Sequence, residues 1–232
     1  MNLDDQEVMM IARIVARLKG MSPEEKEEWF RKAMEAFVEG EANYLQGFDL
    51  PGVTLCSWET FYRDLFGWEL DFSTLVIPRP ERGFDRLLVV PQGLTPESLY
   101  AKCRELFSCW KYTDNLDSIT SERDSAKIGT YAIWVRGRKE ADEEMKNKSA
   151  DDFAASGIKG ITLPERLLYE LKYFMETKKH LDMENLTNCT GSRDTDGEVP
   201  FVTWHVERGW MDVDRFYSGH KFDRLRARAV IA

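Results

Sequence analysis

Residues 191–216 read GSRDTDGEVPFVTWHVERGWMDVDRF, and their pattern predicts a β-hairpin. Phe201 and Thr203 alternate with Val202 and Trp204, which is the two-residue period of a strand. The Glu-Arg-Gly triplet that follows predicts a turn, and a second alternating run comes after it. We therefore expect a hairpin with one face packed against the protein and the other face free.

The segments on either side of this hairpin also carry clear signals. The preceding stretch, ITLPERLLYELKYFMETKKHLD (161–182), begins with Thr162 as N-cap and Glu165 closing a capping box, so it predicts a core helix. The stretch RLRARAVIA (224–232) predicts a third strand, and we expect the end of the chain to be paired into a sheet.

The earlier part of the chain divides into a helical and a mixed region. Helices are expected over Asp4–Leu18, from Ser22 to near Gly40, and over Ser57–Phe66. Further along, FSTLVIP (72–78), RLLVVPQG (86–93) and GTYAIWVRG (129–137) predict strands, Thr95 begins a helix, and a charged helix is expected over Lys139–Lys146, followed by a loop to Gly160. The expected fold class is α+β, with a helical N-terminal lobe at 1–71 and a second domain at 72–232.

Composition narrows the classes of partner. The net charge is −9 and the isoelectric point is near 5, which disfavours a protein that binds nucleic acid through its phosphates. From residue 189 onward seven Lys and Arg balance seven Asp and Glu, so the acidity belongs to residues 1–188. No stretch is long and apolar enough to span a bilayer.

The termini and cysteines favour an ordinary reduced protein. The N-terminus places acids before its apolar residues, which is the wrong order for a secretory signal, so a cytoplasmic location is expected, with non-classical export or surface display as the alternative. The four cysteines form no CxxC pair, so neither a disulfide scaffold nor a zinc knuckle is expected. Cys103 lies on the apolar side of its helix and is expected in the core.

Three kinds of chemistry can be weighed on the C-terminal segment. The DTDG sequence at 194–197 resembles the start of a calcium loop but lacks the remaining ligands and the closing glutamate. A lectin-type sugar site lacks its usual triplet, because Val199 follows Glu198. Cys189 could act as a thiol nucleophile with His205 or His220 as base. We favour the alternative, in which Cys189 begins a strand edge and the histidines are exposed variable positions. We expect no metal and no cofactor.

Three stretches together carry a family resemblance: TYAIWVRGRKEADEEMKNKSADDF, ITLPERLLYELKYFMETKKHLD, and CTGSRDTDGEVPFVTW with the later LRARAV. From about Leu87 to the end, the chain resembles the variable proteins of diversity-generating retroelements. The N-terminal helical lobe has no counterpart in this resemblance.

The resemblance implies a C-type-lectin-like fold, of the branch shared with formylglycine-generating enzymes. It also implies that a reverse transcriptase copies a template with errors at adenines and replaces the 3′ end of the gene. The protein would then combine a fixed scaffold with a diversified segment, here 189–232. The framework positions carried over are Gly191, Ser192, Arg193, Asp196, Gly197, Val199, Pro200, Trp204, Leu225, Arg226, Ala227 and Arg228.

The residues between the framework positions are the candidates for a variable, ligand-binding surface. Adenine-directed change of an AAC codon never yields Lys, Glu, Gln, Met or Trp, and every candidate lies in the permitted set. Arg215 stands where the family pattern usually has an aromatic. The candidates are Asp194, Phe201, Thr203, His205, Asp212, Asp214, Phe216, Tyr217, Ser218, His220, Phe222 and Asp223.

The function expected from the resemblance is ligand binding without catalysis, with a protein as the expected ligand. Exposed candidates could change at little cost in stability, and aromatics such as Phe216, Tyr217 and Phe222 offer contact area at low entropic cost. The same aromatics could instead cover the core from a long loop. Two other functions stay open: a thiol-dependent enzyme on the related fold, and an interaction protein without diversification.

Overall fold

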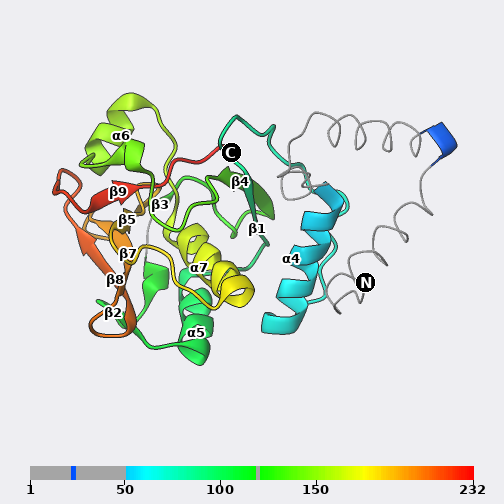
Figure 1. Cartoon of the computed structure of the whole chain (residues 1–232), viewed down its shortest axis with the longest axis horizontal. Helices are drawn as coiled ribbons and strands as arrows, with labels where there is room; N and C mark the ends of the chain where they lie inside the picture. Colours follow the sequence, from blue (N-terminus) through cyan, green and yellow to red (C-terminus); the bar gives the residue numbers. More distant parts are fainter. Residues whose placement is uncertain (1–21, 25–50, 119–120) are drawn as a thin grey trace, which may run out of the picture. The chain divides into compact units, whose positions relative to one another are not determined.

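The computed structural model describes residues 22–24, 51–118 and 121–232 of the chain. The chain divides into two compact units, Met1–Ser73 and Thr74–Ala232. The expected helix over Asp4–Leu18 lies outside the described residues, as does all but the start of the expected helix from Ser22 to near Gly40 (Figure 1).

The described part of the first unit is dominated by α4 (Pro51–Phe66). Trp58 and Tyr62 stack with ring centroids 5.8 Å apart, and both side chains are buried. Gly67, with φ +70°, follows the last helical residue and supplies the left-handed conformation that commonly ends a helix. The helix expected over Ser57–Phe66 is confirmed, and it begins at Pro51.

The second unit is mixed α and β, and its largest sheet has five strands. The strand order is β2-β8-β7-β5-β9, so the β7–β8 hairpin lies within the sheet and β2 forms one edge (Figure 1). β7 pairs antiparallel with β8 and β5, whereas β2–β8 and β5–β9 are parallel. The strands are β2 (Cys109–Lys111), β5 (Leu186–Asn188), β7 (Val199–His205), β8 (Trp210–Phe216) and β9 (Leu225–Ala227).

Two shorter ladders complete the strand pairing. β1 (Arg86–Val90) pairs antiparallel with β4 (Tyr131–Val135), and β3 (Ser121–Glu122) pairs antiparallel with β6 (Ser192–Arg193). An isolated bridge joins Trp134 to Ile231, so the last residues are paired as expected, although the regular strand β9 is only three residues long.

Capping boxes explain where the helices of this unit begin. In α5 (Pro96–Leu106) the N-cap is Thr95, in α6 (Ala150–Ser156) it is Ser149, and in α7 (Leu163–Thr177) it is Thr162. In each, the cap side chain accepts a hydrogen bond from the third helical N–H and the residue there returns one. α7 contacts α5, β1 and β7, and Cys103 of α5 is fully buried, as expected.

The strand expected over FSTLVIP (72–78) is wrong, because no regular element forms there. Val76 is 85% exposed, and Pro78 has no N–H to donate to a ladder. The carbonyl of Pro78 instead accepts the indole N–H of Trp134 at 2.8 Å. The apolar residues of this stretch therefore do not form a buried strand.

The helix expected over Lys139–Lys146 is also wrong. Only one 3-10 turn, η2 (Glu143–Met145), forms, and the loop expected to run to Gly160 contains α6. The reason is that this stretch bonds to distant partners. The Glu140 carboxylate accepts backbone N–H groups of Met183, Glu184 and Asn185, and the buried Asp142 accepts hydrogen bonds from Arg136 and the Ala229 N–H. Another short segment, η1 (Leu116–Ser118), follows β2.

A buried charge network ties α7 to Arg228, the residue that follows β9. The carboxylate of Asp182 accepts hydrogen bonds from Arg166 at 2.9 Å and Arg228 at 2.7 Å, and all three side chains are fully buried. Burial alone would raise the pKa of Asp182, but the two guanidinium groups hold it below its ordinary value. Removing either arginine would leave a buried charge partly uncompensated, which is strongly destabilising.

Among the described residues, no helix is both long and apolar enough to cross a membrane.

Candidate functional site

The β7–β8 register places half of the candidate residues on one face of the sheet. Cα partners across the hairpin are Phe201 with Asp214 and Thr203 with Asp212. Directly paired residues lie on the same face of a sheet, and so do residues two positions apart along a strand. Six candidates therefore lie on one face. This candidate face comprises Phe201, Thr203 and His205 of β7 and Asp212, Asp214 and Phe216 of β8.

The aromatic candidates form one continuous cluster over part of this face. Phe201 stacks on Phe216 with centroids 4.4 Å apart, and His220 stacks on Phe216 at the same separation. Phe222 meets Phe216 at 5.5 Å, and Tyr217 meets His220 at 5.0 Å. The loop after β8 therefore folds back onto the sheet.

This cluster is partly structural, because it covers apolar core. Phe201, Leu186 and Leu225 form a buried cluster, and Phe216 and Phe222 pack against it. Tyr217, by contrast, is 62% exposed. The interpretation that these aromatics cover the core thus holds for Phe216 and Phe222, and Tyr217 is left facing solvent.

The expectation that the candidates lie on a free face is wrong for four of them. Asp194 and Thr203 are 3% exposed, Phe201 is 7% exposed, and Asp212 is 8% exposed. β7 is an inner strand of the sheet, covered by α7 on one side and by the 217–223 loop near Phe201 on the other. Alternation along the sequence identified the two faces, but not that both are covered.

The polar candidates of the face bond to the scaffold and to each other. The hydroxyl of Thr203 lies 2.8 Å from the carbonyl oxygen of Asn185 and 3.0 Å from that of Asp182. His205 Nε2 is 3.0 Å from Asp212 Oδ2, and the Oδ1 of Asp212 is buried without a hydrogen-bond partner. Burial raises the pKa of Asp212, and the nearby His205 opposes that shift.

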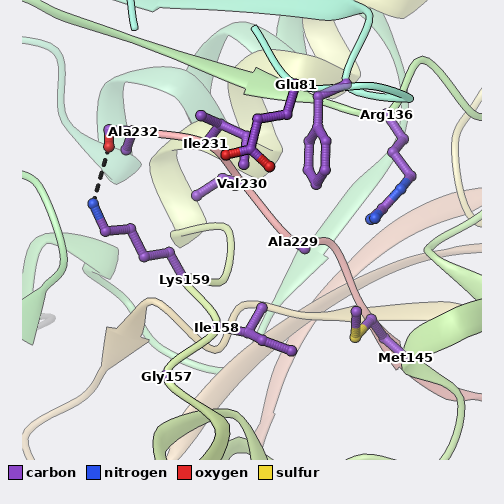
Figure 2. Close-up of a pocket in the computed structure, with 11 residues that line it drawn as sticks. Glu81, Arg136, Met145, Gly157, Ile158, Lys159, Ala229, Val230, Ile231 and Ala232 are labelled. Carbon is purple, nitrogen blue, oxygen red and sulfur yellow. Dashed lines mark hydrogen bonds between the residues drawn. The ribbon is translucent and has the colours of Figure 1, made fainter. Parts of the chain in front are cut away.

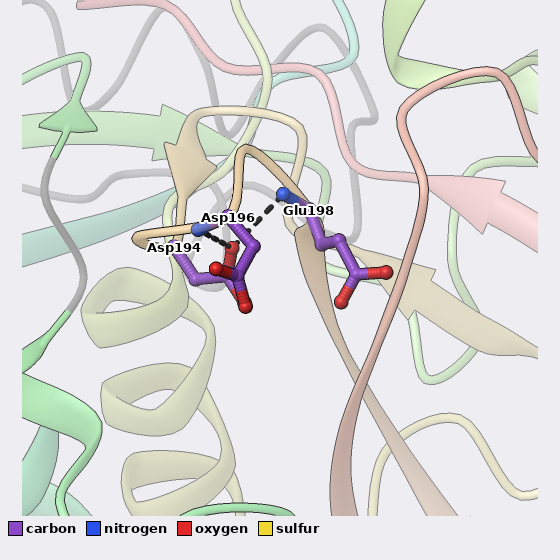
Figure 3. A group of neighbouring side chains, drawn as sticks. All are labelled: Asp194, Asp196 and Glu198. Atoms are coloured by element: carbon purple, nitrogen blue, oxygen red, sulfur yellow. Dashed lines mark hydrogen bonds between the residues drawn. The ribbon is translucent and has the colours of Figure 1, made fainter.

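The acidic DTDG turn gathers three carboxylates around an arginine. Oxygens of Asp194, Asp196 and Glu198 lie within 4.8 Å of one another (Figure 3). Arg215 contacts all three carboxylates, at 2.6 Å, 3.2 Å and 2.6 Å respectively. The hydrogen bond to Asp194 and the surrounding acids raise the pKa of Arg215 above its ordinary value. The guanidinium supplies the positive charge that a calcium ion would bring to such a loop.

Asp194 also fixes the backbone of this turn. Its Oδ1 accepts the N–H of Asp196 and the N–H of Glu198, both at 2.9 Å (Figure 3). This is the Asx-turn arrangement, in which the side chain replaces a backbone acceptor. The candidate Asp194 is therefore a buried structural residue in this chain.

The framework positions carry identifiable structural tasks. A Cβ on Gly191 would lie 2.5 Å from the carbonyl oxygen of Gly160, so only glycine fits. Ser192 Oγ accepts the N–H of Leu163 at 2.9 Å, and Trp204 stacks on His180 with centroids 3.3 Å apart. Trp204 lies on the opposite side of β7 from the candidate face.

Cys189 lies in the interior of the protein. Its side chain is fully buried, and burial raises the pKa of its thiol far above the ordinary value. His205 bonds to Asp212, and His220 stacks on Phe216. In the described part of the chain, Cys189 forms no hydrogen bond with either histidine. An inaccessible, neutral thiol is also a poor nucleophile.

A cavity of about 420 Å³ lies elsewhere in the second unit, and none of the candidates lines it (Figure 2). Ile158, Met145 and Ala229 supply apolar lining. The two cationic side chains that line it already have partners within the chain. Lys159 donates to the carbonyl of Ala232 at 2.9 Å, and Arg136 donates to the Asp142 carboxylate.

One exposed residue beside the candidate face was not among the candidates. Trp110 of the edge strand β2 is the register partner of Asp212, so it shares the candidate face, and it is 45% exposed. Sequence reasoning missed it because a three-residue strand paired in parallel with a segment about a hundred positions later leaves no local periodicity.

Comparison of the chain with protein-family models, with curated proteins and with solved structures gives no match.

Proposed function

We propose that this chain is a ligand-binding variable protein with a C-type-lectin-like second domain. In this proposal the candidate face and the 217–223 loop form the binding surface, a protein is the ligand, and a retroelement diversifies residues 189–232. The observation that carries the proposal is the arrangement of β7 and β8. Six candidates share one face of these strands, while the framework residue Trp204 packs on the other.

The structural roles of the framework residues support this assignment. Gly191 meets a neighbouring backbone closely, Ser192 bonds to the start of α7, and Arg228 neutralises Asp182. Each role depends on the residue type, so these positions could not vary without loss of the fold. The resemblance assigns these same positions to the fixed part of the segment.

Burial narrows the set of positions that can change at low cost. Substitutions at the four buried candidates would disturb the core or the acidic turn, whereas the other candidates are half-buried or exposed. The proposed variable surface is therefore concentrated in eight residues: His205, Asp214, Phe216, Tyr217, Ser218, His220, Phe222 and Asp223.

The gene's neighbourhood tests the retroelement part of the proposal. A reverse-transcriptase gene should lie nearby, together with a near-copy of the segment encoding residues 189–232. Differences between the two copies should fall at template adenines and at candidate codons. Absence of both the reverse transcriptase and the near-copy would leave an interaction protein without diversification as the better conclusion.

A thiol-dependent enzyme is the alternative that makes a different chemical prediction. In the native protein we expect Cys189 to react with a maleimide only as fast as the protein unfolds, because its thiol is buried and neutral. Mass spectrometry after proteolysis would distinguish it from the half-buried Cys109. Rapid, stoichiometric labelling of Cys189 would favour the enzyme.

A further inference from the structure

The candidate face becomes steadily more open toward the edge strand β2. In the row of register partners that crosses the three strands, exposure rises from strand to strand. Thr203 of β7 is 3% exposed, Asp212 of β8 is 8% exposed, and Trp110 of β2 is 45% exposed. The inner end of this row is closed by the scaffold. A ligand resting on the face would therefore meet the β2 edge first.

Trp110 is an exposed aromatic side chain whose ring contacts no other ring and no cation in the described part of the chain. The neighbouring Trp210 differs, since the guanidinium carbon of Arg208 lies 5.3 Å from its ring centroid. A tryptophan ring attracts a cation placed over its face more strongly than other aromatic rings do. Trp110 has this face available.

Two carboxylates share the face of the sheet on which Trp110 lies. Asp214 follows Asp212 by two residues, and its carboxylate accepts the backbone N–H of Arg215 at 2.8 Å. Among the described residues, no cation pairs with this carboxylate. The side chain of Asp212 is 12% exposed, its Oδ2 lies 3.0 Å from His205 Nε2, and its Oδ1 has no hydrogen-bond partner. The twelve candidates include four aspartates and no arginine, and Lys221 of the 217–223 loop is paired with Asp152.

We infer that Trp110, Asp212 and Asp214 form an acidic and aromatic corner that receives an arginine or lysine side chain of the protein ligand. This inference rests on the proposed function of the candidate face and identifies the chemistry of its partner. Trp110 would stack on the cation, Asp214 would pair with it, and the buried Asp212 would add negative potential from beneath.

Trp110 would be the constant member of this corner. It precedes the proposed diversified segment and is a residue type that adenine-directed change of AAC cannot produce. A ligand could therefore use Trp110 as an anchor in every variant, with Asp214 tuning the choice of cation. Tryptophan and arginine are both common among the residues that dominate binding interfaces.

The test is NMR on the full-length protein with ¹⁵N-labelled tryptophan, using a defined probe. The probe is the capped peptide acetyl-Gly-Arg-Gly-amide, and its neutral counterpart carries citrulline in place of arginine. The indole N–H signal of Trp110, assigned with Trp110→Phe, should shift saturably with the arginine peptide, whereas that of the buried Trp58 should not move. The citrulline peptide should bind roughly three- to tenfold more weakly.

Variants at Trp110 and at Asp214 separate the contribution of the ring from that of the charge. Asp214→Asn should weaken the arginine peptide about two- to fivefold, while Glu69→Gln, an exposed carboxylate in the other unit, should leave binding unchanged. Trp110→Leu should abolish the probe's broadening in ligand-observed spectra, and Trp110→Phe should retain part of it.

Equal binding of both peptides, or no saturable shift at Trp110, would overturn the inference. Neither result bears on the gene-neighbourhood test of the proposed function. Conversely, a missing reverse transcriptase would leave a measured preference for arginine at Trp110 intact.

Discussion

Asp194 illustrates how a single side chain can hold a loop in place. One carboxylate oxygen accepts two backbone N–H groups of the acidic turn, and the other accepts a hydrogen bond from Arg215. Removing this side chain, which is 3% exposed, leaves the two backbone N–H groups without their acceptor, while Arg215 keeps its contacts with Asp196 and Glu198. The residue type, and not only its exposure, therefore limits variation here.

We expect Asp194→Ala to lower the free energy of unfolding by about 1–3 kcal/mol, because two partly buried backbone N–H groups lose their acceptor. Denaturant unfolding would measure the loss. The neighbouring exposed Thr195→Ala is the matched control and should change stability by no more than about 0.5 kcal/mol. Equal effects of the two substitutions would contradict the structural role of Asp194.

Arg215 gives a second expectation at this scale. Arg215→Ala removes the cation shared by three carboxylates, so these would repel one another and the melting temperature should fall. Millimolar CaCl₂ should then raise the melting temperature of the variant but not that of the native protein, because calcium can replace the lost charge. The exposed Arg224→Ala is the control. An equal gain with calcium in the native protein would show that Arg215 does not fill this role.

Among the elements, the short β3–β6 ladder contains a carboxyl group with altered acidity. Burial, and secondarily the nearby carboxylate of Glu165, raise the pKa of Glu122 to about 7. Glu122 pairs with Ser192, next to the start of the proposed diversified segment. The protonation of one strand residue is thus coupled to how firmly this segment joins the scaffold.

Stability should consequently depend on pH through Glu122. Below the ordinary glutamate pKa, 4.5, both folded and unfolded chains hold the proton; between that value and about 7 only the folded chain does. This contribution is therefore full at low pH and is lost as the pH rises through 7. Glu122→Gln should match the native protein near pH 4 and exceed it at pH 8 by about 1–3 kcal/mol, or ~2–10 °C in melting temperature.

Thermal unfolding at the two pH values tests this, with the exposed Glu207→Gln as control. A difference between Glu122→Gln and the native protein that is the same at both pH values would rule out the proposed role of Glu122.

The elements that the sequence predicts well are those with local determinants. Thr95 and Thr162 begin their helices with capping boxes, and the β7–β8 hairpin follows its alternation. The stretch 139–146 was mispredicted because its Glu140 and Asp142 side chains satisfy distant backbone groups, which outweighs local helix preference. The alternation of the sequence predicted which residues share the candidate face. It did not predict that several of them are buried, because burial depends on the order of the strands in the sheet.

For the second unit as a whole, the candidate face combines positions that carry core packing with positions that face solvent. Phe201 belongs to a buried cluster, and Tyr217 stands at the rim of the same aromatic group. A surface built in this way can change at its rim while its base holds the sheet together. In the proposed function, the stability that the buried base supplies would limit the diversity of the surface.

We expect Phe201→Ala to cost about 3–5 kcal/mol and Tyr217→Ala to change stability by less than about 0.5 kcal/mol. Both substitutions remove an aromatic ring from the same cluster, so each serves as the control for the other. Denaturant unfolding of the two variants would measure the difference. Similar losses would mean that burial does not separate fixed from changeable positions on this face.

The parallel pairings of β5 with β9 and of β2 with β8 also influence the order in which contacts form during folding. Parallel neighbours cannot be joined by a tight turn, and distant contacts form after local ones. During synthesis α7 and the β7–β8 hairpin can form early, whereas Asp182 receives its second guanidinium only after the ribosome has passed residue 228. Until Arg228 is in place, Asp182 therefore lacks one of its two neutralising guanidinium groups, and docking of β9 completes the pairing of β5.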